Sequence, residues 1–151
     1  MKRHYDMTSL PPSGIYKKGT LKYEQLVSIV QKQTKGKSGA IATYIGLVKS
    51  PGIDDRKVHE LEIEAYPTYS DKMLTKICAD IEKKYHVETA AIYHFEGHFE
   101  VGEILVMVIV AGRSRQNVFP ALEEAIHRYK TEPAIWKKEI YSDGTTKWVN
   151  K

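Results

Sequence analysis

The chain has 151 residues, which is enough for one domain with a buried core. Hydrophobic residues make up 42% and charged residues 28%, so the composition excludes a disordered tail, a fibre and a disulfide scaffold. Lysine and arginine outnumber aspartate and glutamate by 23 to 19, which gives a net charge of +4. This excess favours an anionic partner or substrate, also fits an ordinary solvated surface, and falls short of a nucleic-acid coat protein.

Cysteine content and hydropathy indicate the compartment. Cys78 is the single cysteine, so an internal disulfide and a thiolate zinc cage are excluded and a reducing compartment fits best. The longest apolar run, residues 104–111, is far shorter than the roughly 18 residues of a membrane helix. The basic N-terminus is not followed by the apolar segment of a signal peptide. We therefore expect a cytoplasmic protein that does not enter a membrane.

The chain shows no internal repeat and no low-complexity stretch, which favours one domain. We expect residues 1–14 to form a flexible lead-in and residues 15–151 to form that domain. A short strand is predicted at residues 15–18. The apolar spacing that begins at Tyr23 predicts a helix, and Gly36 is a plausible stop for it.

Two strands are predicted in the next part of the chain. Residues 38–48 are β-branched and aromatic, and residues 58–66 alternate cleanly between apolar and polar side chains. Residues 49–57 contain Pro-Gly and two aspartates and are expected to form a loop. We expect the two strands to pair as a hairpin across this long loop.

A helix is then predicted with Ser70 as its N-cap. Its apolar positions are spaced to form one stripe. Cys78 lies within that stripe, which favours a small core residue over a nucleophile. The stripe contains Met73, Leu74, Ile77, Cys78 and Ile81.

Two further strands, a second long helix and a final hairpin follow. The strands are expected at residues 88–94 and 104–111, joined through residues 96–103. The helix is expected at residues 117–129, and the hairpin joins residues 134–140 and 146–149. Inward positions of this helix are expected to be Val118, Phe119, Leu122, Ile126 and Tyr129. This order of elements predicts an α+β domain with a largely antiparallel sheet and helices packed on one face.

Several common kinds of site have no motif in this sequence. The phosphate-binding GxxxxGK[ST] and GxGxxG motifs, the GxSxG elbow and the HExxH zinc motif do not occur. His94 and His98 are four residues apart, but on a strand and turn that spacing does not align two ligands. No pair of carboxylates has the apolar context that forces one pKa up. We expect no metal, no cofactor, and neither acid–base nor covalent hydrolase chemistry.

Positive charge occurs at three unusual places. Arg113 and Arg115 lie at the start of the second long helix, where cations oppose the helix dipole but free backbone N–H groups can bind an anion. An anion site and a solvated turn both fit them. Lys130 lies at the end of that helix, where the dipole favours its charge and a structural role is sufficient. Lys137 and Lys138 put lysines on both faces of one strand, which fits a polar cleft or a protected sheet edge.

Six segments together resemble a known family, the large catalytic subunit of molybdopterin synthase (the MoaE family). The resemblance covers roughly residues 38–149, and its most specific part is the last block, where a lysine, a proline and Trp-Lys precede a glycine turn and Trp-Val. The segments, in chain order, are GAIATYIGLVK, LEIEAYP, FEVGE, R-x-x-x-F, YKTEPAIWKKE and DGTTKWV.

The resemblance implies a fold of the α/β-hammerhead type and a sulfurtransferase activity. Members of the family convert cyclic pyranopterin monophosphate into molybdopterin by adding the two sulfurs of the dithiolene, a step of molybdenum cofactor biosynthesis. The sulfur arrives as a thiocarboxylate on the C-terminal Gly-Gly tail of a small ubiquitin-like subunit. Two large subunits form a central homodimer with one small subunit at each end, a heterotetramer.

The resemblance also implies roles for particular residues. Lys130 and Lys137 fall on the two catalytic lysines. Lys137 is expected to bind substrate and stabilise negative charge, and Lys130 to orient the thiocarboxylate and assist proton transfer, which requires a lowered pKa. Substrate-binding positions are Tyr44, Lys49, Arg113, Ser114, Arg115 and Lys138.

Three of the positions differ from the family pattern. Lys49 and Ser114 stand where the family has arginine and histidine, and Phe95 stands where arginine is common. In the family, the pair at Ser114 and Arg115 reaches the pocket of the neighbouring subunit.

The alternative to an enzyme is a binding module that docks a ubiquitin-like tail without turnover. Formation of the dithiolene product discriminates between the two. A nucleic-acid binder is not expected, because the sequence does not interleave basic and aromatic residues as such proteins do.

Overall fold

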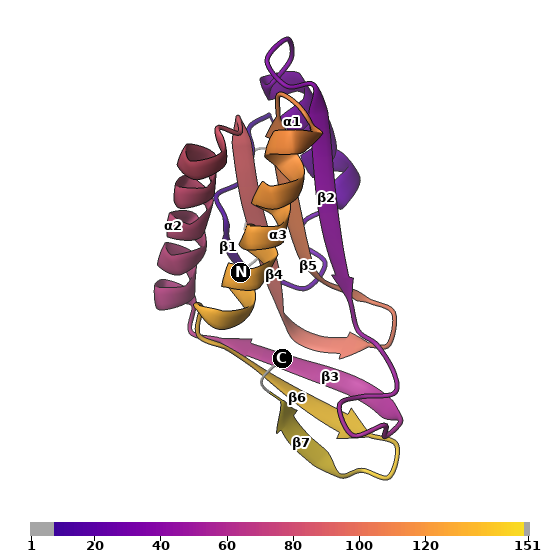
Figure 1. The fold of residues 1–151 in the computed structure, drawn as a ribbon. Helices are drawn as coiled ribbons and strands as arrows, with labels where there is room; N and C mark the ends of the chain where they lie inside the picture. The colour runs from indigo at the N-terminus through magenta and orange to yellow at the C-terminus, as the bar shows by residue number, and fades with distance from the viewer. Residues whose placement is uncertain (1–7, 150–151) are drawn as a thin grey trace.

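The computed structural model describes residues 8–149 (Figure 1). Residues 1–7 of the expected lead-in and residues 150–151 of the expected domain lie outside this range. The order of strands and helices is the expected one. The elements are β1 (Gly14–Lys17), α1 (Tyr23–Gln33), β2 (Ala40–Leu47), β3 (Val58–Ala65), α2 (Pro67–Tyr85), β4 (Thr89–Glu100), β5 (Ile104–Gly112), α3 (Arg115–Thr131), β6 (Ile135–Tyr141) and β7 (Thr146–Val149).

The seven strands that the described residues form make one largely antiparallel sheet, as expected. Its order is β2-β5-β4-β3-β6-β7, and β1 adds to β4 in the one parallel pairing. The expected hairpin between β2 and β3 is wrong, because β2 pairs with β5 and β3 pairs with β4 and β6. The physical reason is that β5 is apolar and buried along nearly its whole length, so it occupies the interior of the sheet between β2 and β4.

Strand β4 joins the two parts of the molecule. Its first half pairs with β5 up to His94, and its second half pairs with β3 from Gly97 to Glu100. Gly97 has a φ of 128°, a conformation that favours glycine, and it lies where β4 changes partner. The segment that was expected to be a connection is therefore largely strand. Below this bend, β3, β6 and β7 form a separate lower part (Figure 1).

The two long helices pack side by side on one face of the upper part, and α1 lies behind β2 in the same view (Figure 1). The inward stripe of α3 differs from the expected one, because Phe119 is 60% exposed. Alanines at the contact between α3 and the sheet are small, so the helix can approach the sheet closely. The prediction had favoured large apolar side chains and therefore did not include these alanines. The buried residues of α3 are Val118, Ala121, Ala125 and Tyr129.

The start of α2 also differs from expectation. The helix begins at Pro67 with Tyr66 as its N-cap residue, so Ser70 is not the cap. Ser70 is buried instead, where its hydroxyl donates to the carbonyl of Ala134 at 3.0 Å and accepts from the amide of the same residue at 3.1 Å. Pro67 occupies the first helical position, where proline is favoured because its φ fits the helix and its missing N–H would have no partner there.

Two further expectations are confirmed within the described range. The β6–β7 hairpin is confirmed, and Cys78 is a core residue, where burial raises the pKa of its thiol to about 12. No helix in residues 8–149 is long and apolar enough to cross a membrane. The end of the expected lead-in is held on the core, because the Tyr93 hydroxyl donates to the Pro11 carbonyl at 2.8 Å and the Ile92 amide donates to the Ser13 hydroxyl at 3.0 Å.

Candidate functional site

A cavity of about 200 Å³ lies where the end of α3, the end of β2 and the middle of β6 meet. It brings together four residues that the sequence analysis singled out, although they are far apart in the chain. We refer to it as the lysine cavity. Those four residues are Tyr44, Lys49, Lys130 and Lys137, and two further polar lining residues are Tyr129 and Glu139.

Its two central lysines come from different elements. Lys130 lies in the last turn of α3 and is exposed, in the position where the helix dipole favours a cation. Lys137 lies in the interior of β6, opposite Ile63 of β3 and Val149 of β7, and is half-buried. Because β6 has a partner on both sides, protection of a sheet edge does not explain Lys137.

Burial lowers the pKa of Lys137 below its usual range, and the charge of the nearby Lys130 lowers it further. This lowered pKa was not predicted for Lys137, which was expected to bind substrate and stabilise negative charge. Within the described residues, neither lysine has an ion-pair partner, and Lys49 has none either. All three ammonium groups are therefore available to an anion from outside.

One wall of the cavity is aromatic and uncharged. The rings of Tyr44 and Tyr129 have centroids 6.5 Å apart, and the ring of Tyr129 lies 5.8 Å from that of His94. Burial lowers the pKa of His94 to about 3, and the charge of Lys137 contributes, so this histidine is neutral near pH 7. Burial and the neighbouring Tyr44 raise the pKa of Tyr129, so it is neutral as well.

Three residues were not predicted for the site: Tyr129 and Glu139, which line the cavity, and His94, whose ring contacts that of Tyr129. Tyr129 was assigned to the core, and His94 was considered only as a metal ligand. Glu139 could have been found, because strand alternation puts it on the same face as Lys137. In the structure it is buried, and its carboxylate accepts hydrogen bonds from the Tyr141 hydroxyl and from the amide of Ile53.

Lys138 does not line this cavity. It points to the opposite face of β6, where its Nζ lies 2.9 Å from Oε2 of Glu62 and 5.3 Å from the ring centroid of Trp148. The ion pair raises the pKa of Lys138 and lowers that of Glu62. Both charges are therefore matched within the chain.

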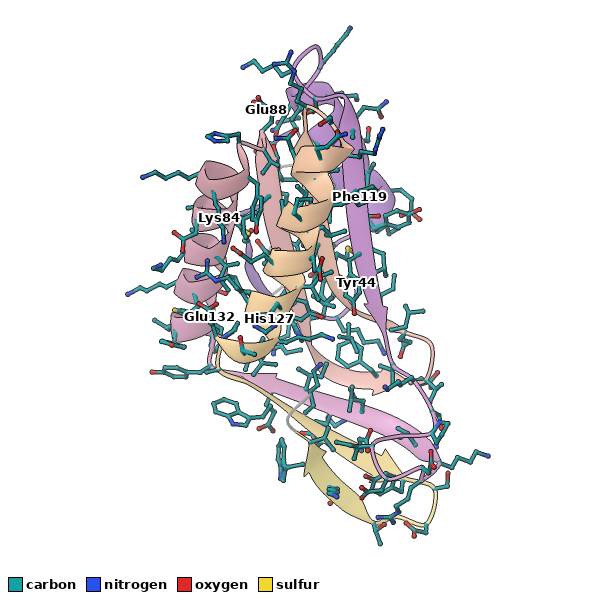
Figure 2. All side chains as sticks on the ribbon, viewed as in Figure 1. Tyr44, Lys84, Glu88, Phe119, His127 and Glu132 are labelled. Atoms are coloured by element: carbon teal, nitrogen blue, oxygen red, sulfur yellow. The ribbon has the colours of Figure 1, made fainter. Side chains whose placement is uncertain are left out.

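Arg113, Ser114 and Arg115 lie at the other end of α3. Lys130 follows Arg115 by 15 residues of helix, a separation of about 22 Å. Figure 2 shows the two ends, with Glu88 and Phe119 toward the start of α3 and His127 and Glu132 toward its end. Within one chain these three residues cannot act in the lysine cavity.

The start of α3 forms a separate surface hollow. Arg113 lines it together with Lys37 and His86, and Arg115 is exposed. Ser114 takes the N-cap position, but its hydroxyl donates to Oδ1 of Asn117 at 2.9 Å and does not accept from a backbone N–H as a capping side chain would. The resemblance assigned Ser114 and Arg115 to the pocket of the neighbouring subunit. The exposed side chain of Arg115 is accessible to such a subunit.

No cluster of three or more histidine, cysteine, aspartate or glutamate side chains within residues 8–149 is arranged to hold a metal ion. The lysine cavity offers three cations beside aromatic groups, and one buried carboxylate, that of Glu139, lines it as well. Such a site binds anions and stabilises negative charge that develops on them.

Comparisons with known proteins agree on one family. The model of the family described as "MoaE protein" matches residues 17–132. The chain is 38% identical over 122 residues to the molybdopterin synthase catalytic subunit of Bacillus subtilis, a match that covers 81% of this chain and 76% of that protein. It spans 54%, 60% and 58% of the length of three mammalian relatives that it matches.

Solved structures give the same result. The crystal structure of molybdopterin synthase from Staphylococcus aureus superposes with a TM-score of 0.80 at 29% identity and covers 93% of this chain and 98% of that one. A complex of subunits 1 and 2 of molybdopterin-converting factor from Helicobacter pylori shares the fold, with a TM-score of 0.72 at 18% identity over 92% of this chain and 89% of that one. On the family model and the close relative together, the chain belongs to the MoaE family.

Proposed function

We propose that this protein is the catalytic subunit of a molybdopterin synthase. It transfers sulfur from the thiocarboxylated C-terminus of a small ubiquitin-like subunit to cyclic pyranopterin monophosphate. The observation that carries the proposal is the lysine cavity in a member of this family, with unpaired ammonium groups that include the half-buried Lys137. We also propose that it works in the cytoplasm.

Both reactants are anions, which fits the charge of the cavity. The substrate carries a phosphate and the tail of the small subunit ends in a thiocarboxylate. Lys49, Lys130 and Lys137 can receive both in one place, although Lys49 binds phosphate as a point charge and not in the bidentate manner of arginine. The chain supplies no sulfur nucleophile, because Cys78 is buried and its thiol has a raised pKa.

The two central lysines take different roles in this proposal. A lysine with a lowered pKa releases and recovers a proton more readily near neutral pH, so Lys137 is assigned to proton transfer as well as to charge stabilisation. Lys130 is exposed and stabilised as a cation by the helix dipole, so it is assigned to orienting the incoming thiocarboxylate. Tyr44 contributes a ring beside them.

The residues at the start of α3 are assigned to the cavity of a second copy. Arg115 is about 22 Å along the helix from Lys130, so it serves a neighbouring subunit in a central homodimer. The exposed side chain of Phe119 lies one turn further along α3 and fits a contact between the copies. Ser114 and Arg113 accompany Arg115 there. Lys138, whose charge is matched by Glu62, has no part in substrate binding.

A reconstituted reaction tests the proposal. The protein is mixed with a thiocarboxylated small subunit and cyclic pyranopterin monophosphate, and dithiolene formation is followed. The proposal is supported if the wild type and Lys32→Ala form product and Lys130→Ala does not. Lys32 is the matched control, since it lies in the last turn of α1. A wild type that binds the small subunit tightly and makes no product would be the binding module instead.

A further inference from the structure

Glu139 is a buried carboxylate in the lysine cavity to which the proposed function gives no role. Only 7% of the residue is exposed. Its Oε1 accepts a hydrogen bond from the Tyr141 hydroxyl at 2.8 Å and one from the backbone amide of Ile53 at 3.2 Å. The first partner belongs to the same strand, but the second belongs to the loop between β2 and β3. Glu139 thus connects the sheet to that loop.

The loop approaches the carboxylate closely at Gly52. A Cβ atom added there would lie 2.4 Å from Oε1, 2.5 Å from Oε2 and 2.6 Å from Cδ of Glu139, closer than real Cβ atoms come. Glycine is thus the residue that lets the backbone pass beside this side chain. The amide of Gly52 donates to the Arg56 carbonyl at 2.8 Å, which closes the turn of the loop.

Other contacts of the same loop lie on its exposed side. Asp54 pairs with Lys147 at 2.7 Å, and Arg56 pairs with Asp143 at 3.1 Å. These pairs are solvated and contribute little, since exposed ion pairs are screened by water and salt. The contact through Glu139 is part-buried, and a hydrogen bond to a charged group is stronger than one between neutral groups.

The loop begins at Lys49, one of the three cations of the cavity. Just before it, Val48 is fixed because its amide donates to the Glu103 carbonyl at 3.0 Å and its carbonyl accepts from Gly102 at 2.8 Å. Just after it, the Ser50 hydroxyl accepts from the Val58 amide at 3.1 Å. Lys49 is therefore held on both sides, and the chain after it continues to Gly52 and Ile53, which contact Glu139.

We infer that Glu139 is a positioning residue, whose carboxylate holds residues 50–57 against β6 and thereby sets where Lys49 stands in the lysine cavity. The inference rests on the proposed function for the identity of the anion that Lys49 meets, and on the contacts above for the positioning itself. Glu139 lies beside Lys137 on the inner face of β6, and it orders residues 50–57 across the cavity from that face.

Hydrogen exchange tests the positioning without any turnover. In Glu139→Ala, the amide of Ile53 is expected to exchange about tenfold faster, the size of one lost hydrogen bond to a charged group. Gly52→Ala perturbs the same contact from the loop side and should speed the exchange of the Ile53 amide equally. Glu139→Gln keeps an acceptor oxygen, so its exchange rate should lie between those of the wild type and Glu139→Ala. The control is Glu24→Ala, an exposed glutamate of α1. Unchanged exchange of the Ile53 amide in Glu139→Ala and Gly52→Ala would overturn the inference.

A double-mutant cycle tests the link to Lys49. The probe is a synthetic peptide that ends in Gly-Gly with a free carboxylate, and its affinity is measured by calorimetry. Glu139→Ala and Lys49→Ala should each weaken binding about tenfold, and the double variant should lose no more than Lys49→Ala alone. Additive losses would show that Glu139 acts independently of Lys49 and would contradict the inference. A wild type that fails in the reconstituted reaction refutes the proposed function but leaves both readouts of the positioning intact.

Discussion

Lys137 and Lys138 are consecutive residues of β6, yet they lie on opposite faces of the sheet and in opposite electrostatic environments. Lys138 on the outer face is paired with Glu62, which raises its pKa. Lys137 on the inner face is half-buried and has no acidic partner among the described residues, and burial lowers its pKa. The difference teaches that a lysine whose charge is matched within the chain is structural, whereas an unmatched one beside a cavity is available to a ligand.

The largest expected effect on activity comes from replacing Lys137, on the inner face of β6. Lys137→Ala removes the group assigned to proton transfer and to stabilising negative charge, so product formation should fall by roughly 100-fold or more. The measurement is dithiolene formation in single turnover, with binding of the small subunit as the control for folding. If Lys137→Ala keeps activity within a few-fold of the wild type, the claim that the two faces of β6 differ in function is wrong.

The second prediction concerns the neighbouring subunit. Arg115→Ala should weaken substrate binding about tenfold at low salt and less at high salt, because a charge contact is lost. Mixing Arg115→Ala with Lys137→Ala subunits should restore part of the activity, since one cavity of each mixed dimer then keeps both groups. Unchanged affinity at low salt, or no recovery on mixing, would contradict the assignment of Arg115 to a second copy.

The third prediction is a gain in stability. The folded pKa of Lys137 lies below its unfolded value, so the unfolded chain binds more protons in the window between them and stability rises with pH there. Below that window the buried charge costs stability in full. Lys137→Met should therefore raise Tm at pH 7, by about 2–4 °C for each kcal/mol recovered. Thermal unfolding across pH 7 to 10 checks this, and a Tm that falls in Lys137→Met would refute it.

The smallest effect is expected on the outer face. Lys138→Ala breaks the pair with Glu62, which is partly exposed, and should cost no more than about 1 kcal/mol of stability. Product formation should remain near that of the wild type, because Lys138 does not line the lysine cavity. A loss comparable to that of Lys137→Ala would place Lys138 in the site after all.

Much of the fold followed from local patterns. Order and type of the elements were predictable because each strand and helix carries its own periodicity. Strand pairing was not, because the choice between β3 and β5 as the partner of β2 depends on which strand needs burial on both faces. The buried stripe of α3 was misjudged for a similar reason, since Ala121 and Ala125 pack by virtue of being small.

The candidate site was predictable in part. Lys130 and Lys137 were noted for their places at a helix end and within a strand, and the resemblance implied them as site residues together with Tyr44 and Lys49. Strand alternation places Glu139 on the face of Lys137, but its contact with Ile53 was not predictable, because Ile53 lies 86 positions earlier in the chain, in a loop whose path no local pattern describes. Lys138 was included because the resemblance implied it, and in the structure it lies on the other face of β6, outside the lysine cavity.

The central claim is that anionic substrate binds in the lysine cavity, between Lys49, Lys130 and Lys137. A crystal structure with cyclic pyranopterin monophosphate tests it most directly. The account predicts the phosphate in the lysine cavity, within salt-bridge distance of Lys49, Lys130 or Lys137. Substrate bound only in the hollow beside Arg113, with the lysine cavity empty, would contradict it.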